Sequence, residues 1–353
     1  NFYDVRSMYV SCYDVPVPIR ELLWTIPSLD KGSFAYAKVK VPRDLYIGPL
    51  PVRYRGRLIF PVGEIPPAWW DIRELRYAVE LGCDITIVKQ LEADEEPVLK
   101  EFADYTYNLR LNAGKEIESR LWKLFGLRLS GKFGQSRWQS QLVHSSQIED
   151  FTGGVPLDEN EEYHEFMRYR KGNKAPFIKP AVNARIRAEA RVRHTKLLMR
   201  AHRQGDIFYC DTDSIVCNSS MSTGPKMGRL QLVNKAQRGY FLQCKFYGYI
   251  TMEGELKQIS AGFRDFKLSE WDFQKLLDGT KQVEETYLGL NNWRDVLKQA
   301  EVRGIDRGRK VSGTLGFKNR KRVDQDTLPL IFKRQGDHYV LDRESKKQSK
   351  LDD

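Results

Sequence analysis

The stretch Phe208-Tyr209-Cys210-Asp211-Thr212-Asp213-Ser214-Ile215-Val216 places two carboxylates one residue apart within a run of strand-forming residues. Alternate side chains of a β-strand share a face, so this pattern predicts that Asp211 and Asp213 point the same way. Two neighbouring acidic side chains repel each other and are costly to desolvate, and a divalent cation relieves both effects. Asp-Thr-Asp-Ser is also ordinary turn composition, so a metal site and a simple turn both remain open at this point.

Two further segments carry related residues. Asn1-Phe2-Tyr3-Asp4-Val5-Arg6-Ser7-Met8-Tyr9 is a second strand-like run, which holds one acid and then a turn-like Arg-Ser pair. A long helical segment carries Lys123 and closes with Leu129-Ser130-Gly131-Lys132-Phe133-Gly134. The order along the chain is therefore an acid, a basic helix and an acid pair.

This order resembles motifs A, B and C of the family B DNA polymerases, and most closely their protein-primed branch from phages, linear plasmids and related mobile elements. In that branch motif A reads Asp-x-x-Ser-x-Tyr and motif C reads Tyr-x-Asp-Thr-Asp-Ser, which match the residues from Asp4 to Tyr9 and from Tyr209 to Ser214. Lys245-Phe246-Tyr247 falls where the family has its Lys-x-Tyr motif. The resemblance extends from Tyr3 to about Leu277.

The resemblance implies an α+β fold, the right-hand polymerase, with an antiparallel palm sheet, helical fingers and a small thumb. The expected parts are palm with motif A and an inserted β-rich segment (1–97), fingers helices with motif B (98–135), palm with motif C (136–261), thumb (262–336) and a flexible charged tail (337–353). Residues 136–172 form a polar insertion. In protein-primed enzymes, insertions placed like 32–88 and 136–172 often contact the priming protein and wrap the DNA.

Hydrophobic periodicity and end signals predict the secondary structure. The expected elements are a β-meander (32–62), a helix from Pro66-Pro67 to Glu80, a strand (85–88), two helices broken at Asn112-Ala113-Gly114 (98–133), a helix (181–204), strands (207–217 and 240–250) and a helix after the N-cap Ser269.

Transfer of a phosphoryl group from a nucleoside triphosphate uses two divalent ions about 3.5–4 Å apart. Mg²⁺ prefers oxygen ligands, and Mn²⁺ is the alternative ion, so carboxylates and phosphate oxygens are the expected ligands. The resemblance implies Asp4 and Asp213 as the main metal ligands, Asp211 as a less direct one, and the backbone carbonyl of Val5 as an addition. The other interpretation of Asp4 is an exposed acid at the end of a strand.

Four residues are implied as contacts of the incoming dNTP. Tyr9 matches the tyrosine that lies under the sugar and excludes a 2′-hydroxyl; its other interpretation is a core tyrosine. Lys123 matches the motif B lysine, which neutralises the triphosphate and is placed to protonate the leaving pyrophosphate. Arg110 resembles a second fingers cation, and Lys132 remains from the end of motif B. For Lys123 and Arg110 the alternative is a solvated helix face.

The primer and template are expected to meet other residues. Lys245 and Tyr247 are predicted to share one face of a strand, and in the family this pair holds the primer terminus. Lys257 resembles the basic strand that leads to the thumb. Both lysines have an ordinary surface interpretation. Helix 181–204 carries seven Arg or Lys, too widely spread for all of them to meet DNA, and the basic cluster at 303–322 suits phosphate contacts.

The sequence departs from its family in motif B. The usual Lys-x-x-x-Asn-Ser-x-Tyr-Gly is replaced by Leu127-Arg128-Leu129-Ser130-Gly131 over its last five places. The Asn, Ser and Tyr that flank the nascent base pair are missing, although Lys123 and Gly131 remain. This departure puts fidelity and sugar discrimination in doubt and leaves a catalytically weakened enzyme as one outcome.

Composition agrees with a polyanionic partner. The 353 residues carry a net charge of +11, and 41% are apolar, enough for two or three subdomains with a real core. Five cysteines without C-x-x-C spacing predict reduced thiols, no zinc site and a cytoplasmic location, in the host cell if the source is viral or plasmid-borne. No apolar run approaches the roughly 18 residues of a membrane span. Because the chain opens on Asn1, it is expected to be the polymerising part of a longer or split protein, without an exonuclease domain.

Three functions are compatible with the sequence. The expected one is template-directed DNA synthesis, with a DNA primer-template and dNTPs as partners, a terminal priming protein as a further candidate partner, and no membrane. A second is a nucleic-acid-binding relic or fragment of such an enzyme. A third is an RNA-directed or ribonucleotide-using polymerase; Thr212 argues against it because reverse transcriptases place the two acids side by side, and Tyr9 argues against ribonucleotides.

Overall fold

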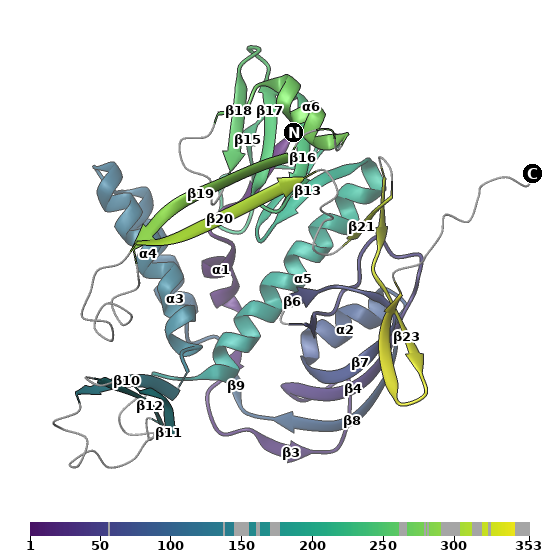
Figure 1. Ribbon diagram of the computed structural model, residues 1–353. Coiled ribbons are helices and arrows are strands. Elements are labelled where there is room, and N and C mark those ends of the chain that lie inside the picture. The colour runs from purple at the N-terminus through teal and green to yellow at the C-terminus, as the bar shows by residue number, and fades with distance from the viewer. Residues whose placement is uncertain are drawn as a thin grey trace, which may run out of the picture.

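The computed structural model describes residues 1–55, 57–136, 138–144, 155–159, 163–169, 177–260, 267–278, 280, 282–290, 304–312, 320–323 and 326–342. They form an α+β structure in which long helices run beside several sheets (Figure 1). Helix α5 (Pro180–Gln204) crosses the centre of the molecule. One sheet contacts its C-terminal part and another lies beside its N-terminal part.

The first sheet holds the acids. Its strand order is β13-β14-β1-β15, and every pairing is antiparallel. The bounds are Phe2–Val5 for β1, Ile207–Asp211 for β13, Ser214–Cys217 for β14 and Leu230–Asn234 for β15. Tyr3 and Val5 are buried against α5, while Asp4 between them points to the other face. The antiparallel sheet predicted to bear Asp4 and Asp213 is thereby confirmed as a sheet.

Two helices flank the segment that follows β1. The chain turns at Ser7 and forms α1 (Met8–Ser11) and the short 3₁₀ helix η1 (Cys12–Asp14). Helices α3 (Lys100–Leu111) and α4 (Glu116–Phe133) pack on it as an antiparallel pair. The predicted break at Asn112-Ala113-Gly114 is confirmed.

The second sheet has six strands in the order β24-β23-β7-β4-β8-β3, with α2 (Ile72–Glu80) on one face. The bounds are Leu23–Thr25 for β3, Phe34–Val41 for β4, Val62–Asp71 for β7, Asp84–Glu92 for β8, Ile331–Gln335 for β23 and His338–Asp342 for β24. This sheet, α2, β5 (Val52–Tyr54) and β6 (Arg57–Ile59) surround a second hydrophobic core, separate from the one between the first sheet and α5.

The prediction that Pro66-Pro67 begins a helix is wrong. Both prolines lie in β7, where Ala37 pairs with Ala68 and Val39 with Ile65, so two residues oppose Lys38 alone. Proline is tolerated in a sheet at such a bulge, because it has no amide to give to the ladder. The helix begins six residues after Pro66, where the Asp71 side chain accepts the Arg73 amide at 2.9 Å.

The C-terminal boundaries predicted from the sequence are also wrong. Residues 331–335 belong to the second sheet and not to a separate thumb, since β23 pairs with Val62 and Gly63 of β7 in parallel. Residues 338–342 form β24 in place of a loose tail. Residues 343–353 lie outside the described part of the chain.

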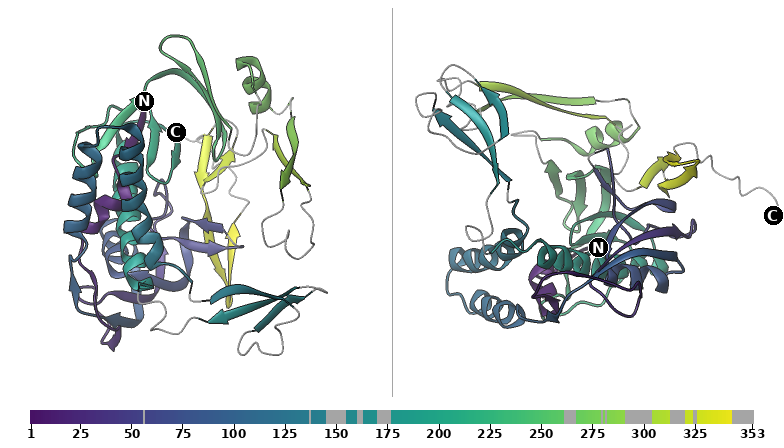
Figure 2. Two further views of the ribbon diagram at one scale, coloured as in Figure 1. Left: turned by 90° about the vertical axis from the view of Figure 1, so that its left-hand side faces the viewer. Right: turned by 90° about the horizontal axis from the view of Figure 1, so that it is seen from below.

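The remaining elements are smaller. The bounds are Val17–Pro18 for β2, Glu95–Glu96 for β9, Trp138–His144 for β10, Val155–Glu159 for β11, Tyr163–Tyr169 for β12, Ala236–Gln243 for β16, Phe246–Thr251 for β17, Leu256–Ser260 for β18, Glu270–Leu277 for α6, Gln282–Leu290 for β19, Gly304–Ser312 for β20, Arg320–Val323 for β21 and Asp326–Pro329 for β22. The N-cap predicted at Ser269 is confirmed by a capping box with Asp272. In both views of Figure 2, sheets β10–β12 and β19–β20 lie on the same side of the α3–α4 pair.

Two findings concern membranes and thiols. Within the described ranges, no helix has both the length and the apolar composition needed to cross a bilayer. All five cysteines are described, and no disulfide joins them.

Candidate active site

Asp4 and Asp213 meet where three strands of the first sheet end. The Val5 amide donates to the Asp213 carbonyl oxygen at 2.9 Å, and Asp4 pairs in register with Ser214. The Gln231 side chain on β15 donates to the Asp4 carboxylate at 3.2 Å. The backbone thus holds two carboxylates from chain positions 209 residues apart beside each other.

Asp211 and Asp213 are not brought together by strand alternation, so that prediction is wrong. Residues 212 and 213 form the tight turn of the β13–β14 hairpin. The Asp213 amide donates to the Asp211 carbonyl at 2.6 Å, and Thr212 has a φ of 56°. Positive φ is an outlier for a β-branched residue, and such strain is concentrated at functional sites. The turn interpretation of Asp-Thr-Asp-Ser was therefore correct, and the turn delivers Asp213 to Asp4.

The electrostatics of the pair favour a cation. Burial, with contributions from the neighbouring Asp4 and Asp211, raises the pKa of Asp213 to about 6, and Lys123 on α4 acts in the opposite direction. The exposed Lys123 is thus close enough to act on the Asp213 charge. A raised carboxyl pKa means that the ionised pair lacks a full counter-charge in the protein alone.

Lys245 lies near Asp211, although not as predicted. It occupies the turn before β17 with a φ of 57°, so it does not share a strand face with Tyr247. Its amide donates to the Tyr209 hydroxyl at 2.9 Å, and its ammonium lies 3.8 Å from the Asp211 carboxylate. Tyr209 is buried in β13, two residues before Asp211, and it fixes this turn over the acid.

Tyr9 and Arg110 border the same region. Burial raises the pKa of Tyr9, with a contribution from Asp213, while Arg187 and Arg191 of α5 lower it. The Arg110 guanidinium on α3 donates to the Ser7 hydroxyl at 2.7 Å, in the turn that follows Asp4. Tyr9 is thus half-buried, packs against the core below the first sheet and lies within electrostatic reach of Asp213.

The structure does not bring Lys132 to the acids. It lies nine residues after Lys123 on α4, which is about 13 Å along the axis and on the opposite side of the helix. Its ammonium lies 4.3 Å from the centroid of the Phe177 ring instead.

Tyr247 belongs to an aromatic cluster between the first sheet and the sheet β16–β17–β18. Its ring centroid lies 4.8 Å from that of Tyr209 and 5.4 Å from that of Phe241. Lys257 on β18 is exposed and pairs in register with Tyr249. Both residues lie in the neighbouring sheet, Tyr247 in β17 and Lys257 in β18.

The donor set suits Mg²⁺ or Mn²⁺. Within the described part of the chain, no group of three or more His, Cys, Asp or Glu side chains gathers into a ready-made metal cage. Asp4 and Asp213 supply hard oxygen donors and leave the other positions to water and phosphate, which is how Mg²⁺ is usually bound at nucleotide sites. The raised pKa of Asp213 is the observation that supports the fit.

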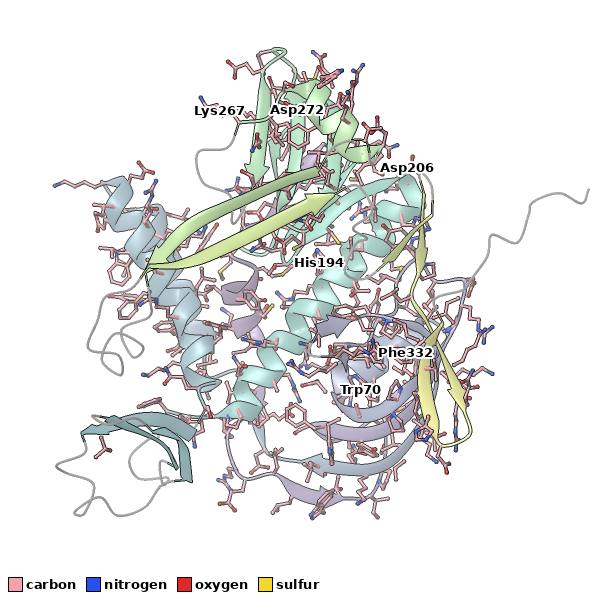
Figure 3. The ribbon with its side chains drawn as sticks, in the orientation of Figure 1. Trp70, His194, Asp206, Lys267, Asp272 and Phe332 are labelled. Atoms are coloured by element: carbon pink, nitrogen blue, oxygen red, sulfur yellow. The ribbon has the colours of Figure 1, made fainter. Side chains whose placement is uncertain are left out.

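Sequence reasoning missed His194 on α5 (labelled in Figure 3). Its Nε2 lies 3.5 Å from the carbonyl oxygen of Ser214, directly after the acid-bearing turn. Burial lowers the pKa of His194, which favours the neutral ring. A histidine on a basic helix gives no sequence signal for this position.

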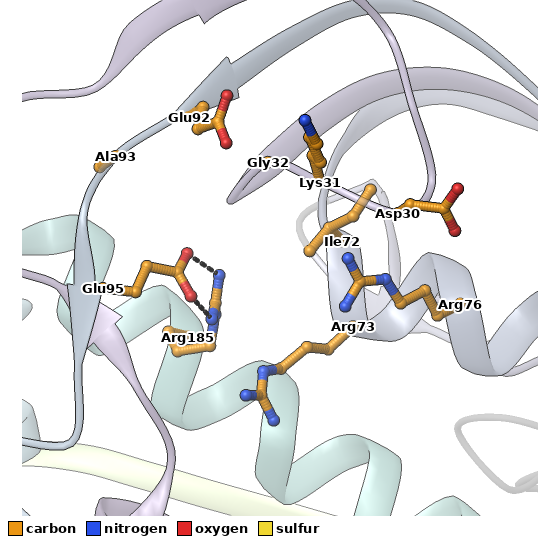
Figure 4. A pocket seen from close by; sticks show the side chains of 10 residues that line it. All are labelled: Asp30, Lys31, Gly32, Ile72, Arg73, Arg76, Glu92, Ala93, Glu95 and Arg185. Atoms are coloured by element: carbon orange, nitrogen blue, oxygen red, sulfur yellow. Dashed lines mark hydrogen bonds and ion pairs between the residues drawn. The ribbon is translucent and has the colours of Figure 1, made fainter.

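Several cations of α5 are structural. Arg185 is fully buried and pairs with Asp71 at 2.5 Å and with Glu95 at 2.6 Å, as Figure 4 shows for Glu95. Arg191 pairs with Glu74 at 2.6 Å, and Glu189 with Arg193 at 2.8 Å. A cavity of about 270 Å³ beside Arg185 is lined by both acids and bases and lies away from Asp4. The expectation that α5 cannot turn all its charges to DNA is confirmed.

Of the basic cluster at 303–322, the described members lie in β20 and β21. Residues 303 and 318 lie outside the described part of the chain, as do residues 160–162 of the acidic run in the polar insertion.

Comparison with known proteins now assigns the family. A family model of DNA polymerase type B, organellar and viral, matches residues 1–180, which is about half of the 353 residues and includes Asp4, Arg110 and Lys123. The chain belongs to this family of type B DNA polymerases. No curated protein matches it.

Phi29 DNA polymerase has a similar fold. Its ternary complex with primer-template DNA and incoming nucleotide substrates matches with a TM-score of 0.62 and 17% identity, covering 88% of this chain and 57% of that chain. Its binary complex with primer-template DNA and its complex with single-stranded DNA both match with a TM-score of 0.63. At this identity the likeness concerns the fold, and the chain spans a little over half of the polymerase that it matches.

Proposed function

We propose that the chain is a template-directed DNA polymerase that adds dNTPs to a 3′-hydroxyl with the help of two divalent ions. One observation carries the proposal: Asp4 and Asp213, far apart in sequence, meet at one end of an antiparallel sheet with Lys123 opposite them. Family membership and the Phi29-like fold supply the context.

The carboxylates and the cations of the site have different proposed roles. Asp4 and Asp213, with the Val5 carbonyl and less directly Asp211, would hold Mg²⁺ or Mn²⁺, which lowers the pKa of the attacking hydroxyl and neutralises the triphosphate. Lys123 and Arg110 are cations on the helices above the acids and suit the phosphates of the dNTP.

Tyr9 would exclude a ribose, because its ring lies beside the acids where a 2′-hydroxyl would project. Replacing Tyr9 by Ala is then expected to raise the incorporation of ribonucleotides, and unchanged discrimination would remove this assignment.

The parts of the fold receive roles on the same basis. The four-stranded sheet with α5 corresponds to a palm, α3 and α4 to fingers, and the region from α6 through β20 to a thumb. Lys245, Tyr247 and Lys257 form the side on which a primer terminus and template would lie. The sheet β10–β12 and the segment 32–88 are the candidate contacts of a terminal priming protein, and we further propose a viral or mobile-element source and an intracellular site of action.

A relic that binds nucleic acid without catalysis is the second candidate. It is favoured by motif B, in which Leu127-Arg128-Leu129-Ser130 stand where the family has residues that flank the base pair. The intact acids and Lys123 favour catalysis.

Primer extension decides between the two. A labelled DNA primer on a DNA template is incubated with the protein, dNTPs and Mg²⁺, beside the variants Asp213→Asn and Asp158→Asn, an acid of the polar insertion. Extension by the wild type and by Asp158→Asn, with none by Asp213→Asn, is the expected result. A folded wild-type protein that binds primer-template and extends nothing would favour the relic.

A further inference from the structure

The hydroxyl of Tyr13 takes part in the hydrogen-bond ladder of α4. It donates to the Gly126 carbonyl oxygen at 2.7 Å and accepts the Ser130 amide at 3.0 Å. These two groups are four residues apart, so they are the pair that bond directly in an uninterrupted α-helix. A residue of η1 is therefore built into one turn of a helix that lies more than 100 residues later.

This bridge is dry. Tyr13 has 0% of its surface exposed and Ser130 has 8%. The ring of Tyr13 packs 6.4 Å from that of Phe102 on α3. A buried amide or carbonyl that loses its partner costs about 1–3 kcal/mol, and water has little access to replace the hydroxyl here.

Close packing adds to the bridge at Gly126. A Cβ atom on this glycine would lie 3.1 Å from Val10 Cγ2 and 3.5 Å from Thr106 Oγ1, so α1, α3 and α4 approach one another at this point. The C-terminal end of α4 is held by the start of α5. The Asn183 side chain donates to the Ser130 carbonyl, and the Lys179 amide donates to the Phe133 carbonyl. Helix α4 is thus fixed to α5 at its C-terminal end and to η1 in its middle.

The two segments that the Tyr13 hydroxyl joins, α4 and η1, both connect to residues of the candidate active site. Lys123 is three residues before Gly126, one turn earlier on α4. Tyr13 is four residues after Tyr9 and nine after Asp4, in the segment that runs on from β1. A shift of α4 relative to η1 would therefore shift the Lys123 cation relative to the carboxylates.

We propose that Tyr13 is a positioning residue, which sets the place of Lys123 over Asp4 and Asp213 for the incoming dNTP. The proposal rests on the proposed function. It also gives a structural role to the altered motif B: the turn from Leu127 to Ser130, which lacks the usual Asn, Ser and Tyr, is held to η1 by the bond from the Ser130 amide to the Tyr13 hydroxyl.

Tyr13→Phe removes the hydroxyl and keeps the ring, and Tyr3→Phe is the matched control. The Tyr3 hydroxyl is also buried, donates to the Ser219 carbonyl at 3.2 Å and accepts the Met221 amide at 3.0 Å, but it ties β1 to a loop away from α4. Both variants are expected to lose similar stability. Only Tyr13→Phe is expected to raise the KM for dNTP, by roughly tenfold for the loss of one buried hydrogen bond, with the Kd for primer-template unchanged.

Calorimetry of dNTP binding with Mg²⁺ and a dideoxy-terminated primer-template separates the possible failures. Weaker dNTP binding by Tyr13→Phe than by Tyr3→Phe supports the positioning role. Equal dNTP affinity of the two variants overturns it, whatever their stability. A wild-type protein that binds dNTP but extends no primer contradicts the proposed function alone, and one that binds no dNTP contradicts both.

Discussion

The negative charge of the Asp213 carboxylate is disfavoured by burial and by two neighbouring acids. Its carbonyl oxygen accepts the Val5 amide, its neighbours include Asp4 and Asp211, and the exposed Lys123 acts to lower its pKa. A group with these surroundings resists ionisation until a cation arrives. Stability and metal binding are therefore linked through this one side chain.

The first prediction concerns pH. The pKa of Asp213 is raised from 3.8 to about 6, so the folded protein holds this proton more tightly than the unfolded chain does. The group then destabilises the metal-free fold as pH rises from about 4 through 6, and the full penalty applies above that. Asp213→Asn is expected to be more stable than the wild type near pH 7 without metal, with the advantage shrinking near pH 4. Urea unfolding at several pH values measures this; a difference that does not vary with pH would contradict it.

The second prediction adds the metal. Mg²⁺ at about pH 7 is expected to raise the Tm of the wild type, since a ligand that binds only the folded state stabilises it. Asp213→Asn and Asp4→Asn are expected to gain much less. A thermal-shift titration tests this, and equal gains in all three proteins would place the ion elsewhere.

The third prediction concerns Thr212. Its φ of 56° costs about 1 kcal/mol or more for a β-branched residue, and Gly removes that cost. Thr212→Gly is expected to raise the free energy of unfolding by up to about 1 kcal/mol and to slow primer extension, because the Asp213 turn becomes less fixed. Arg55→Gly, at a φ of 48° in the β5–β6 turn, is the control expected to leave extension unchanged. A faster Thr212→Gly enzyme would contradict the idea that this strain serves the site.

At the scale of elements, local sequence signals predicted the helices better than the strands. The break between α3 and α4, the ends of α5 and the cap at Ser269 follow from Gly, Pro and Ser at positions where the backbone requires them. The turn at Asp213 was one of two open interpretations, and the Pro66-Pro67 bulge was missed because it depends on which strand lies opposite. The sequence predicted Asp4 and Asp213 as candidate acids, whereas Tyr13 and His194 act through tertiary contacts that leave no local pattern.

The fourth prediction concerns the attachment of α5 to the second sheet. Arg185 is buried between Asp71 and Glu95, and removing one partner of a buried ion pair typically costs 3–5 kcal/mol. Arg185→Met is expected to lose about that much stability. The exposed Arg187 is the control, and Arg187→Met should change stability by less than about 0.5 kcal/mol. Chemical denaturation measures both; comparable small losses would mean that the buried network contributes little.

At the scale of the whole molecule, the second sheet joins the two halves of the sequence. Phe332 has 0% of its surface exposed, and its ring lies 5.4 Å from that of Tyr54 in the second core. Val62 pairs with Ile331, which lies 269 residues later, and no local pattern in either strand predicts this pairing. The sequence did not predict this pairing.

The fifth prediction follows from that pairing. Phe332→Ala is expected to destabilise the protein by about 3–5 kcal/mol, the usual cost of removing a buried Phe ring. Val340→Ala on the same hairpin, where Val340 is 40% exposed, should cost well under 1 kcal/mol. A negligible loss in Phe332→Ala would show that the hairpin is dispensable for the core.

The pairing of β23 with β7 joins two segments that the ribosome makes at different times. The ribosome makes β7 before residues 331–342, so until these residues emerge the edge of β7 that pairs with β23 has no partner. A bare strand margin invites pairing with other nascent chains, and proline is one of the residues that discourage it. The Pro66-Pro67 bulge lies on this strand, only three residues past the two that β23 later covers. Proline at this place would disfavour pairing of β7 with another chain until residues 331–342 are made.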